Sequence, residues 1–223
     1  MPEAQQASRT HRLSSIVLYG AGSPILGDVE ETCRRLGRTI EAVVQNIAEA
    51  GPLEPGRPIV RPDELTAERL KLCFAIPLFG AANRAFAWSE AVKRGARIFE
   101  PLVDPTAILP FHLTLEEGVY INCGVVIGSR ARLGRFAFIN RAAILGHHVE
   151  LDEFVSVGPG ANIGSLVRIG RGATIATGAV IVSGVRIGAE ATVGIGAVVL
   201  CDVPPGATVV GNPARVVRTA LPR

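Results

Sequence analysis

The sequence lacks closely spaced cysteines and long apolar runs. Its four cysteines, Cys33, Cys73, Cys123 and Cys201, are widely separated and form no C-x-x-C pair. This spacing indicates neither a zinc site nor a disulfide framework, and it fits a reducing cytoplasm. No segment approaches the ~20 consecutive apolar residues of a transmembrane helix, and residues 1–13 lack the apolar core of a signal peptide. We therefore expect a cytoplasmic protein with no membrane span.

The chain also has little excess charge of either sign. Its 23 basic and 20 acidic residues give a net charge of +3 and are scattered along 223 residues. A protein that binds nucleic acid usually carries a concentrated basic patch, so small-molecule partners are expected instead. Charged residues make up 19% of the chain and hydrophobic residues 48%, which excludes a disordered protein. The length allows one or two domains.

An unbroken six-residue repeat runs through the second half of the chain. Stepping by six from Val103 to Val199 meets seventeen positions, all of them Ile, Leu or Val. Four residues after each of the first sixteen stands a second apolar residue, from Ala107 to Ala197, and Gly, Asn or Asp often follows the large aliphatic. Neither the 3.6-residue period of a helix nor the ~8–12-residue spacing of a meander explains this pattern. The repeat predicts a parallel β-helix of about five coils with three hexads per coil and with the seventeen aliphatics buried.

Residues 14–100 lack this repeat and predict a small α/β domain with a Rossmann-like parallel sheet. The expected elements are a strand at 14–19, a helix at 27–36, a strand at 40–44, a loop at 52–62, a short helix at 63–69, a strand at 71–78, a helix at 83–94 and a strand at 97–99. The glycine-rich loop after the first strand is suited to a phosphate. A nicotinamide cofactor is not expected, because Ile25 replaces the third fingerprint glycine and Gln45 and Asn46 replace the acidic ribose ligand.

Three motifs, together with the repeat, carry a resemblance to a known family. They read Tyr-Gly-Ala-Gly-Ser at 19–23, Gly-Ala-Ala-Asn-Arg at 80–84 and Val-Gly-Asn-Pro-Ala at 210–214. The chain resembles the hexapeptide-repeat, left-handed β-helix acyltransferases of the sialic acid O-acetyltransferase and nucleotide-amino-sugar N-acetyltransferase type. The resemblance implies a left-handed coil, a homotrimer, acetyl-CoA as donor, a nucleotide-linked sugar as acceptor and no metal. The expected organisation is a tail at 1–13, a substrate-binding domain at 14–100, a β-helix at 101–217 and a tail at 218–223.

Acetyl transfer needs a base for the acceptor's proton, and histidine suits that task because it titrates near neutrality. His147 stands at a predicted corner, two positions after the repeat aliphatic Leu145. The resemblance makes His147 the general base and places His148 where the family has an assisting acid. The nearby acids that would replace this missing acid are Glu150, Asp152 and Glu153. Which of them assists His147, or whether none does, stays open at this point.

The remaining site residues follow from coil stacking and from the resemblance. Stacking by 18 residues places Ser165 beside His147, so the backbone N–H groups of Gly164 and Ser165 are the expected oxyanion donors. The resemblance assigns coenzyme A contacts to Ser156, Thr177 and Ile195. Arg215 and Arg218 are further candidates for contacts with the nucleotide phosphates, and the glycine-containing loops make Gly20, Gly22, Ser23 and Gly80 the candidate acceptor contacts.

Two other functions fit a β-helix of this kind. The first is a non-catalytic scaffold. The second is a γ-type carbonic anhydrase, which needs histidines that converge on one zinc ion. His112 and His148 fall on the same predicted corner but two coils apart, and no third histidine is expected near them. The acyltransferase is therefore the favoured prediction.

Overall fold

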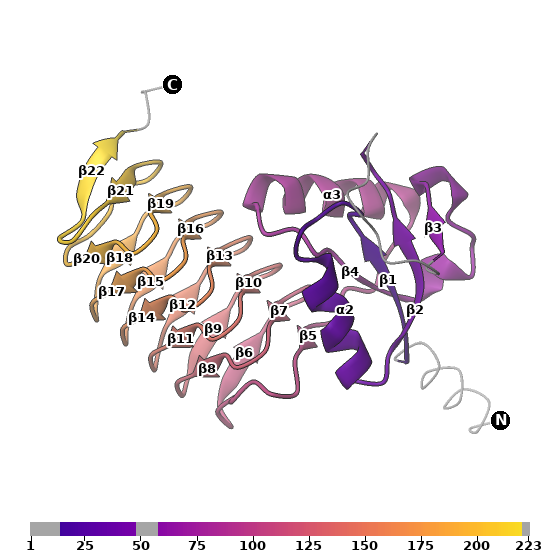
Figure 1. Cartoon of the computed structure of the whole chain (residues 1–223), viewed down its shortest axis with the longest axis horizontal. Coiled ribbons are helices and arrows are strands. Elements are labelled where there is room, and N and C mark those ends of the chain that lie inside the picture. The colour runs from indigo at the N-terminus through magenta and orange to yellow at the C-terminus, as the bar shows by residue number, and fades with distance from the viewer. Residues whose placement is uncertain (1–13, 48–57, 220–223) are drawn as a thin grey trace.

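The computed structural model describes residues 14–47 and 58–219, which form an α/β part and a long ladder of short strands (Figure 1). The predicted tail at 1–13, residues 220–223 of the predicted tail at 218–223 and most of the predicted loop at 52–62 lie outside the described residues. No helix within the described ranges is long and apolar enough to cross a membrane.

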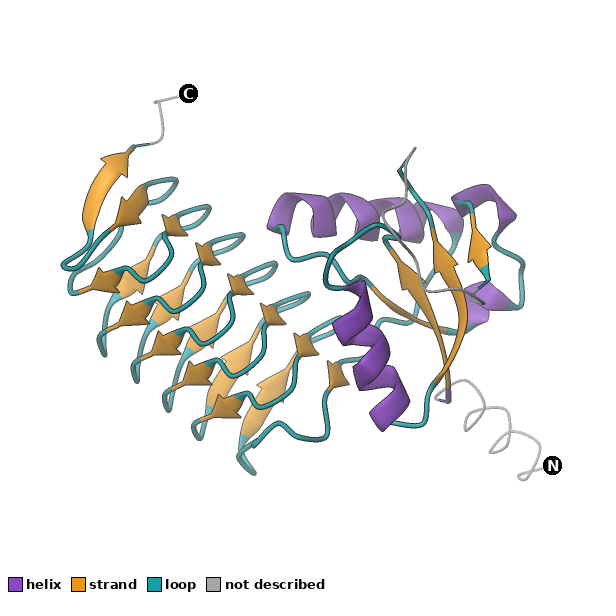
Figure 2. Cartoon of the chain, in the orientation of Figure 1, coloured by secondary structure: helices purple, strands orange, loops and turns teal. Residues whose placement is uncertain are grey.

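A four-stranded parallel sheet in the order β3-β2-β1-β4 forms the centre of the α/β part (Figure 2). Its elements are β1 (Ser15–Tyr19), α2 (Leu26–Arg35), β2 (Thr39–Val44), β3 (Ile59–Val60), the 3-10 turns η1 (Pro62–Glu64) and η2 (Arg69–Lys71), β4 (Cys73–Ala75) and α3 (Ala81–Arg94). The predicted Rossmann-like parallel sheet is therefore confirmed.

Three local predictions in this part need correction. The predicted short helix at 63–69 is two separate 3-10 turns, because Leu65 between them has an extended backbone. The predicted strand at 97–99 is a single bridge from Ile98 to Cys73. The predicted loop at 52–62 contains strand β3 in its described part, paired with the end of β2.

The second part is a prism of three parallel sheets, the predicted left-handed β-helix. Sheet 1 contains β5 (Leu102–Val103), β7 (Tyr120–Ile121), β10 (Phe138–Ile139), β13 (Ser156–Val157), β16 (Thr174–Ile175), β19 (Thr192–Val193), β21 (Thr208–Val210) and the antiparallel β22 (Arg215–Arg218). Sheet 2 contains β8 (Val126–Ile127), β11 (Ile144–Leu145), β14 (Asn162–Ile163), β17 (Val180–Ile181) and β20 (Val198–Val199). Sheet 3 contains β6 (Leu113–Leu115), β9 (Ala131–Leu133), β12 (Glu150–Leu151), β15 (Arg168–Ile169) and β18 (Arg186–Ile187).

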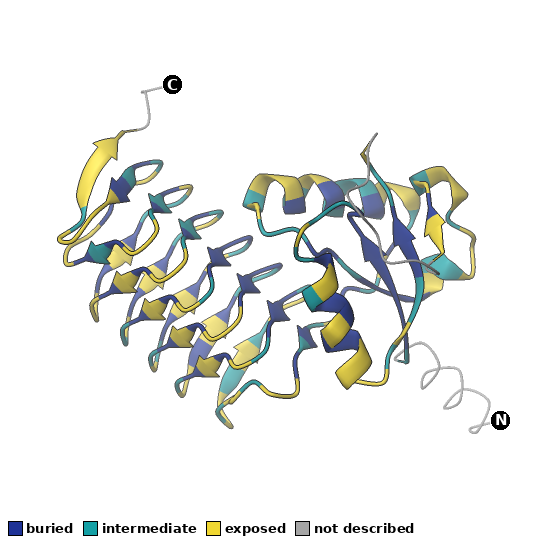
Figure 3. Cartoon of the chain, in the orientation of Figure 1, coloured by how far each residue is buried: buried dark blue, intermediate teal, exposed yellow. Residues whose placement is uncertain are grey.

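The repeat aliphatics fill the inside of the prism, and the outward-pointing residues beside them are mostly exposed on sheets 2 and 3 (Figure 3). Fourteen of the seventeen are buried, including Ile127, Ile163 and Ile181. Leu109 is 37% exposed, which contradicts the prediction for that position, and Val103 and Leu115 are half-buried. All three lie in the first coil, where no preceding coil covers them.

The glycines that follow the repeat aliphatics serve coil stacking. A Cβ on Gly146 would lie 2.5 Å from the backbone nitrogen of Ser165 in the next coil, so any side chain there would push the coils apart. The left-handed backbone of the corners falls two positions later, as at His148 with a φ of 56°. Close approach between neighbouring coils is therefore what requires glycine at these positions.

The α/β part covers the outer face of the first rungs of sheet 1. The outward-pointing side chains of Leu102, Tyr120, Phe138 and Ser156 are all buried there. Along the corner between sheets 3 and 1, the rings of Phe136 and Phe154 stack with centroids 5.4 Å apart and pack against Trp88 of α3.

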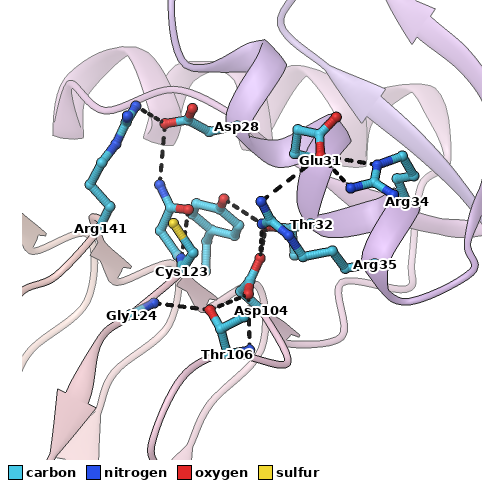
Figure 4. A network of polar contacts seen from close by, with 12 residues as sticks. Asp28, Glu31, Thr32, Arg34, Arg35, Asp104, Thr106, Cys123, Gly124 and Arg141 are labelled. Atoms are coloured by element: carbon cyan, nitrogen blue, oxygen red, sulfur yellow. Dashed lines mark hydrogen bonds and ion pairs between the residues drawn. The ribbon is translucent and has the colours of Figure 1, made fainter.

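A polar network ties α2 to the first coils (Figure 4). The buried carboxylate of Asp104 accepts hydrogen bonds from Thr32 at 2.9 Å and from Arg35 at 2.6 Å. Nearer the start of α2, Asp28 forms an ion pair with Arg141, which lies at the corner between sheets 1 and 2. These contacts place the start of α2 above that corner.

The burial pattern yields a stability prediction. Leu145→Ala should lower the free energy of unfolding by about 2–5 kcal/mol, because it removes a buried side chain and leaves a cavity in the prism. Urea denaturation followed by circular dichroism measures this loss. Leu109→Ala, the same change at an exposed repeat position, should cost less than about 1 kcal/mol. Equal losses for the two variants would contradict the assigned burial.

Candidate active site

A pocket of about 480 Å³ opens at the carboxyl ends of β1 and β2. It is lined by Ala21, Gly22, Ser23, Pro24, Ile25, Asn46, Ile47, Leu78, Phe79, Gly80, Asn83 and Phe86. We call it the strand-end pocket. It brings together three of the predicted acceptor residues, Gly22, Ser23 and Gly80, from two loops that lie far apart in the sequence. No charged side chain lines it among the described residues.

The fourth predicted acceptor residue, Gly20, has a backbone role. It is buried and does not line the strand-end pocket. Its φ of 128° is accessible to glycine, and a Cβ would lie 3.1 Å from the side chain of Leu78. Gly20 therefore shapes the loop that carries Gly22 and Ser23, and the prediction that it contacts the acceptor needs correction.

Asn46 and Phe86 are two lining residues of the strand-end pocket to which the sequence analysis assigned no role. The amide of Asn46 donates a hydrogen bond to Glu90 at 3.2 Å. Phe86 of α3 is 67% exposed and offers an aromatic surface beside the pocket. The sequence signal for Phe86 is its place outside the buried stripe of α3, which contains Arg84, Ala87 and Ala91.

Arg84 joins the wall of the strand-end pocket to the β-helix, although its side chain is only 1% exposed. Its guanidinium donates to the carbonyl oxygens of Leu78 at 2.6 Å and Phe79 at 2.7 Å. It also donates to carbonyls of the prism at Phe136 and Phe154, both at 2.8 Å. Burial lowers the pKa of Arg84 to about 9, so the group stays protonated at neutral pH. The motif at 80–84 contains this residue, but its partners could not be predicted from the sequence.

Ser156 lies in the same junction, which corrects its predicted contact with coenzyme A. Its side chain is fully buried under the α/β part. The hydroxyl donates to the carbonyl of Phe79 at 2.6 Å and accepts from Arg84 at 3.0 Å. Ser156 points outward from sheet 1 at the rung that the α/β part covers, so it is not accessible to a coenzyme.

The predicted base His147 is exposed at the corner between sheets 2 and 3. Its Nδ1 lies 3.0 Å from Nδ1 of the half-buried His148. Because two imidazole nitrogens share this contact, one ring donates and the other accepts. The Nε2 atom of His147 is then the ring nitrogen left for a ligand.

None of the three candidate assisting acids has a contact with His147 in the described structure. Glu150 points outward from sheet 3 and lies 3.6 Å from Arg168. Glu153 belongs to the next corner, where it pairs with Arg135 at 2.5 Å and Arg171 at 3.0 Å. Asp152 begins that same corner. The side chain that contacts His147 in the described structure is therefore His148.

The two predicted oxyanion donors differ in availability. The N–H of Gly164 donates to the carbonyl of Ile181 at 2.8 Å within the coil ladder, so it is not free for a substrate and its prediction needs correction. The N–H of Ser165 donates to the hydroxyl of Ser183 at 3.1 Å on the exposed corner. A hydroxyl can rotate away, which leaves Ser165 as the candidate donor.

The predicted coenzyme A residues that remain lie on another corner. Thr177 and Ile195 are exposed between sheets 1 and 2, and Ile195 is 79% exposed. Arg215 and Arg218 are exposed on β22. Among the residues described, no cluster of three or more His, Cys, Asp and Glu side chains is placed to hold a metal ion.

The strand-end pocket and His147 lie on different sides of the prism. The pocket belongs to the α/β part, which covers sheet 1, and Phe79 of its wall packs against Phe138 with centroids 5.8 Å apart. His147 lies at the corner between sheets 2 and 3, and in a triangular prism that corner is opposite sheet 1. One chain therefore does not bring the pocket and the histidine pair together.

No protein-family profile and no curated protein sequence matches the chain, so its similarity is to solved structures. One is a variant of GDP-perosamine N-acetyltransferase from Caulobacter crescentus in which a histidine is replaced by alanine, in complex with CoA and GDP-perosamine. It is 25% identical, covers 92% of this chain and 97% of its own, and has a TM-score of 0.82. The acetyltransferase domain of PglB from Neisseria gonorrhoeae, in complex with acetyl coenzyme A, is 27% identical, with coverages of 92% and 99% and a TM-score of 0.81.

WeeI from Acinetobacter baumannii is a third similar structure, 25% identical, with coverages of 91% and 99% and a TM-score of 0.78. These similarities span the α/β part as well as the β-helix, and they confirm the resemblance predicted from the sequence. The chain is therefore similar, in both its α/β part and its β-helix, to hexapeptide-repeat acetyltransferases, one of which is a GDP-perosamine N-acetyltransferase.

The corrected position of Ser156 yields a prediction. Ser156→Ala should lower the free energy of unfolding by about 1–3 kcal/mol, because it removes a buried hydrogen-bond partner. It should leave the affinity for acetyl-CoA unchanged, as measured by isothermal titration calorimetry. The exposed corner serine offers the control Ser129→Ala, which should change neither quantity. A selective loss of acetyl-CoA affinity in Ser156→Ala would mean that Ser156 does contact coenzyme A.

Proposed function

We propose that this acyltransferase moves the acetyl group of acetyl-CoA to the amine or hydroxyl of a nucleotide-linked sugar. The observation that carries the proposal is the strand-end pocket of about 480 Å³, at the carboxyl ends of parallel strands, in a chain that shares its whole fold with a GDP-perosamine N-acetyltransferase. Ligands of open parallel sheets bind at this end of the strands. The strand-end pocket is accordingly the acceptor site.

The outer face of sheet 2 favours assembly of the chain into a trimer. Its outward-pointing column is mostly apolar: Ile108, Val126, Ile144, Asn162, Val180 and Val198. Ile108 is 65% exposed and Ile144 is 45% exposed. The matching column of sheet 3 is polar, with Arg132, Glu150 and Arg168 in register. An exposed apolar face of this extent marks a protein interface, and a closed ring buries the same face in every subunit.

Assembly through sheet 2 completes the site. Around a threefold axis, the edge of sheet 2 that carries His147 in one subunit meets the opposite edge of sheet 2 in the next. That opposite edge lies beneath the start of α2, where Asp28 pairs with Arg141, and hence beside the strand-end pocket. The same edge carries Thr177 and Ile195, which contact coenzyme A in this proposal, while Arg215 and Arg218 meet its phosphates. Each active site therefore uses residues of two subunits.

The chemistry is a general-base acyl transfer. Nε2 of His147 takes the proton of the acceptor amine or hydroxyl as the acceptor atom attacks the thioester carbonyl carbon. The N–H of Ser165 stabilises the tetrahedral oxyanion once Ser183 turns aside. The intermediate collapses with cleavage of the carbon–sulfur bond, and the coenzyme A sulfur receives the proton from His147. His148 fixes the orientation of the His147 ring through the contact between their Nδ1 atoms.

The mechanism predicts a large effect of one histidine. His147→Ala should lower kcat about 10²- to 10⁴-fold while leaving acetyl-CoA affinity nearly intact, because the base acts in the chemical step. His148→Ala should lower kcat less, since His148 acts only through its contact with His147. Thiol release from acetyl-CoA, assayed with a panel of UDP-, GDP-, dTDP- and CMP-linked sugars, measures kcat.

The exposed His112 offers a matched control on the same prism, and His112→Ala should be as active as the wild type. A larger loss in His148→Ala than in His147→Ala would make His148 the base. If both variants keep activity within a few-fold of the wild type, the histidine mechanism is wrong.

The assembly has its own test. Ile144→Asp places a charge on the apolar face of sheet 2, so it should convert a particle of three chains into single chains of 23.4 kDa, as measured by light scattering. Activity should fall with the assembly, because the site needs two subunits. Arg132→Asp, on the polar face of sheet 3, is the control and should remain trimeric. A wild-type protein that is monomeric in solution would refute this arrangement.

A further inference from the structure

Two successive peptide carbonyls in the wall of the strand-end pocket point away from the pocket. The carbonyl of Leu78 accepts from Arg84 at 2.6 Å, and the carbonyl of Phe79 accepts from Arg84 at 2.7 Å and from Ser156 at 2.6 Å. Both donors are buried in the junction with the β-helix. Arg84 and Ser156 thus hold the two peptide units from the side that faces away from the pocket.

This anchoring fixes where the opposite side of each peptide unit points. In a trans peptide, the N–H of the next residue is directed opposite to the carbonyl. The peptide bonds from Leu78 to Phe79 and from Phe79 to Gly80 are both trans, because the cis bond among the described residues is Asn212–Pro213. The N–H groups of Phe79 and Gly80 therefore face away from Arg84, and both residues line the strand-end pocket. Within residues 14–47 and 58–219, neither N–H donates a recorded hydrogen bond.

The charge of Arg84 is not cancelled by any of its recorded partners. Its hydrogen-bond acceptors are five carbonyl oxygens and the hydroxyl of Ser156, and no carboxylate pairs with it in the described structure. Such a buried and unpaired cation is costly. Here it lies directly behind a pocket that has no charged side chain among its described lining residues. It therefore contributes positive potential to the pocket wall at Phe79 and Gly80.

Successive backbone N–H groups that point the same way form a site for anionic oxygen atoms. We propose that the N–H groups of Phe79 and Gly80 bind the phosphate oxygens of the nucleotide-linked acceptor, and that Arg84 is the positioning residue that holds them toward the strand-end pocket. This inference rests on the proposed function, because it takes the acceptor to be a phosphate ester. It gives the acceptor site a phosphate contact without a lysine or arginine in the pocket.

Gly80 offers a test of the N–H contact. Its φ of −65° matches the fixed φ of proline, and a Cβ there would lie 3.6 Å from the nearest atom, in the side chain of Asn83. Gly80→Pro therefore removes the N–H and keeps the backbone, while Gly80→Ala adds a Cβ and keeps the N–H. Calorimetric titration with GDP, UDP, dTDP and CDP identifies the tightest wild-type ligand. Gly80→Pro should bind that ligand about tenfold or more weakly, and Gly80→Ala within about twofold of the wild type.

The matching nucleoside, which has no phosphate, separates a phosphate contact from a change in pocket shape. All three proteins should bind it equally. Equal diphosphate binding by Gly80→Pro and Gly80→Ala would overturn the inference, and so would an equal loss of nucleoside and diphosphate affinity. Failure of the wild type to bind any of the four diphosphates would overturn the proposed acceptor site as well, so the two failures are distinguishable.

Arg84→Lys tests the positioning role, because it keeps the charge but loses the planar fork that reaches several carbonyls. Its diphosphate affinity should fall about tenfold, while its affinity for acetyl-CoA is unchanged. Thr32→Val is the control: it removes a buried hydrogen bond to Asp104 on the other side of the same junction, at α2. Thr32→Val should destabilise the protein and bind the diphosphate normally. Equal losses of diphosphate affinity in the two variants would mean that Arg84 only joins the two parts of the chain, and would overturn its positioning role.

Discussion

From Leu102 to Val199 the strands of neighbouring coils pair with residues 18 positions away, and this register governs the rest of the molecule. It stacks the aliphatic columns into one continuous core. It also brings the coils so close at the corners that Gly146 cannot carry a Cβ without meeting Ser165. The side chains that follow such glycines are thereby lined up along the corners, and His147 and Ser165 become neighbours because their coils are neighbours.

The α/β part depends on the same prism for its position. Arg84 at one side of the junction and Asp104 at the other are both buried, and each is hydrogen-bonded to residues across the junction. Buried polar groups with several fixed partners define one arrangement far better than apolar contact alone. The strand-end pocket is accordingly held in a fixed position relative to sheet 1. A rigid pocket matters here because its proposed reaction partner comes from another subunit.

The sequence alone was sufficient for the β-helix, because one six-residue period with two apolar columns leaves a single way to bury both. The parallel order of the α/β sheet followed from its alternating strands and helices. Local details differ from the prediction: the short helix expected at 63–69 is two turns. Leu109 fits the repeat but is exposed, because it lies at the open end of the prism. The loops carrying Gly22 and Gly80 were also identified, because glycine-rich loops after strands have a recognisable composition.

Tertiary structure decided what each candidate residue touches. A repeat defines which side chains point outward, but not which outer face another part of the chain will cover, so Ser156 looked accessible and proved buried. The same holds for Arg84, whose partners are main-chain carbonyls up to 71 residues away and therefore leave no trace in the amino-acid pattern. The acids near His147 in sequence point to other faces, because the chain turns a corner between them. Side-chain identity and spacing are local properties, whereas burial and hydrogen-bond partnership depend on contacts between distant segments.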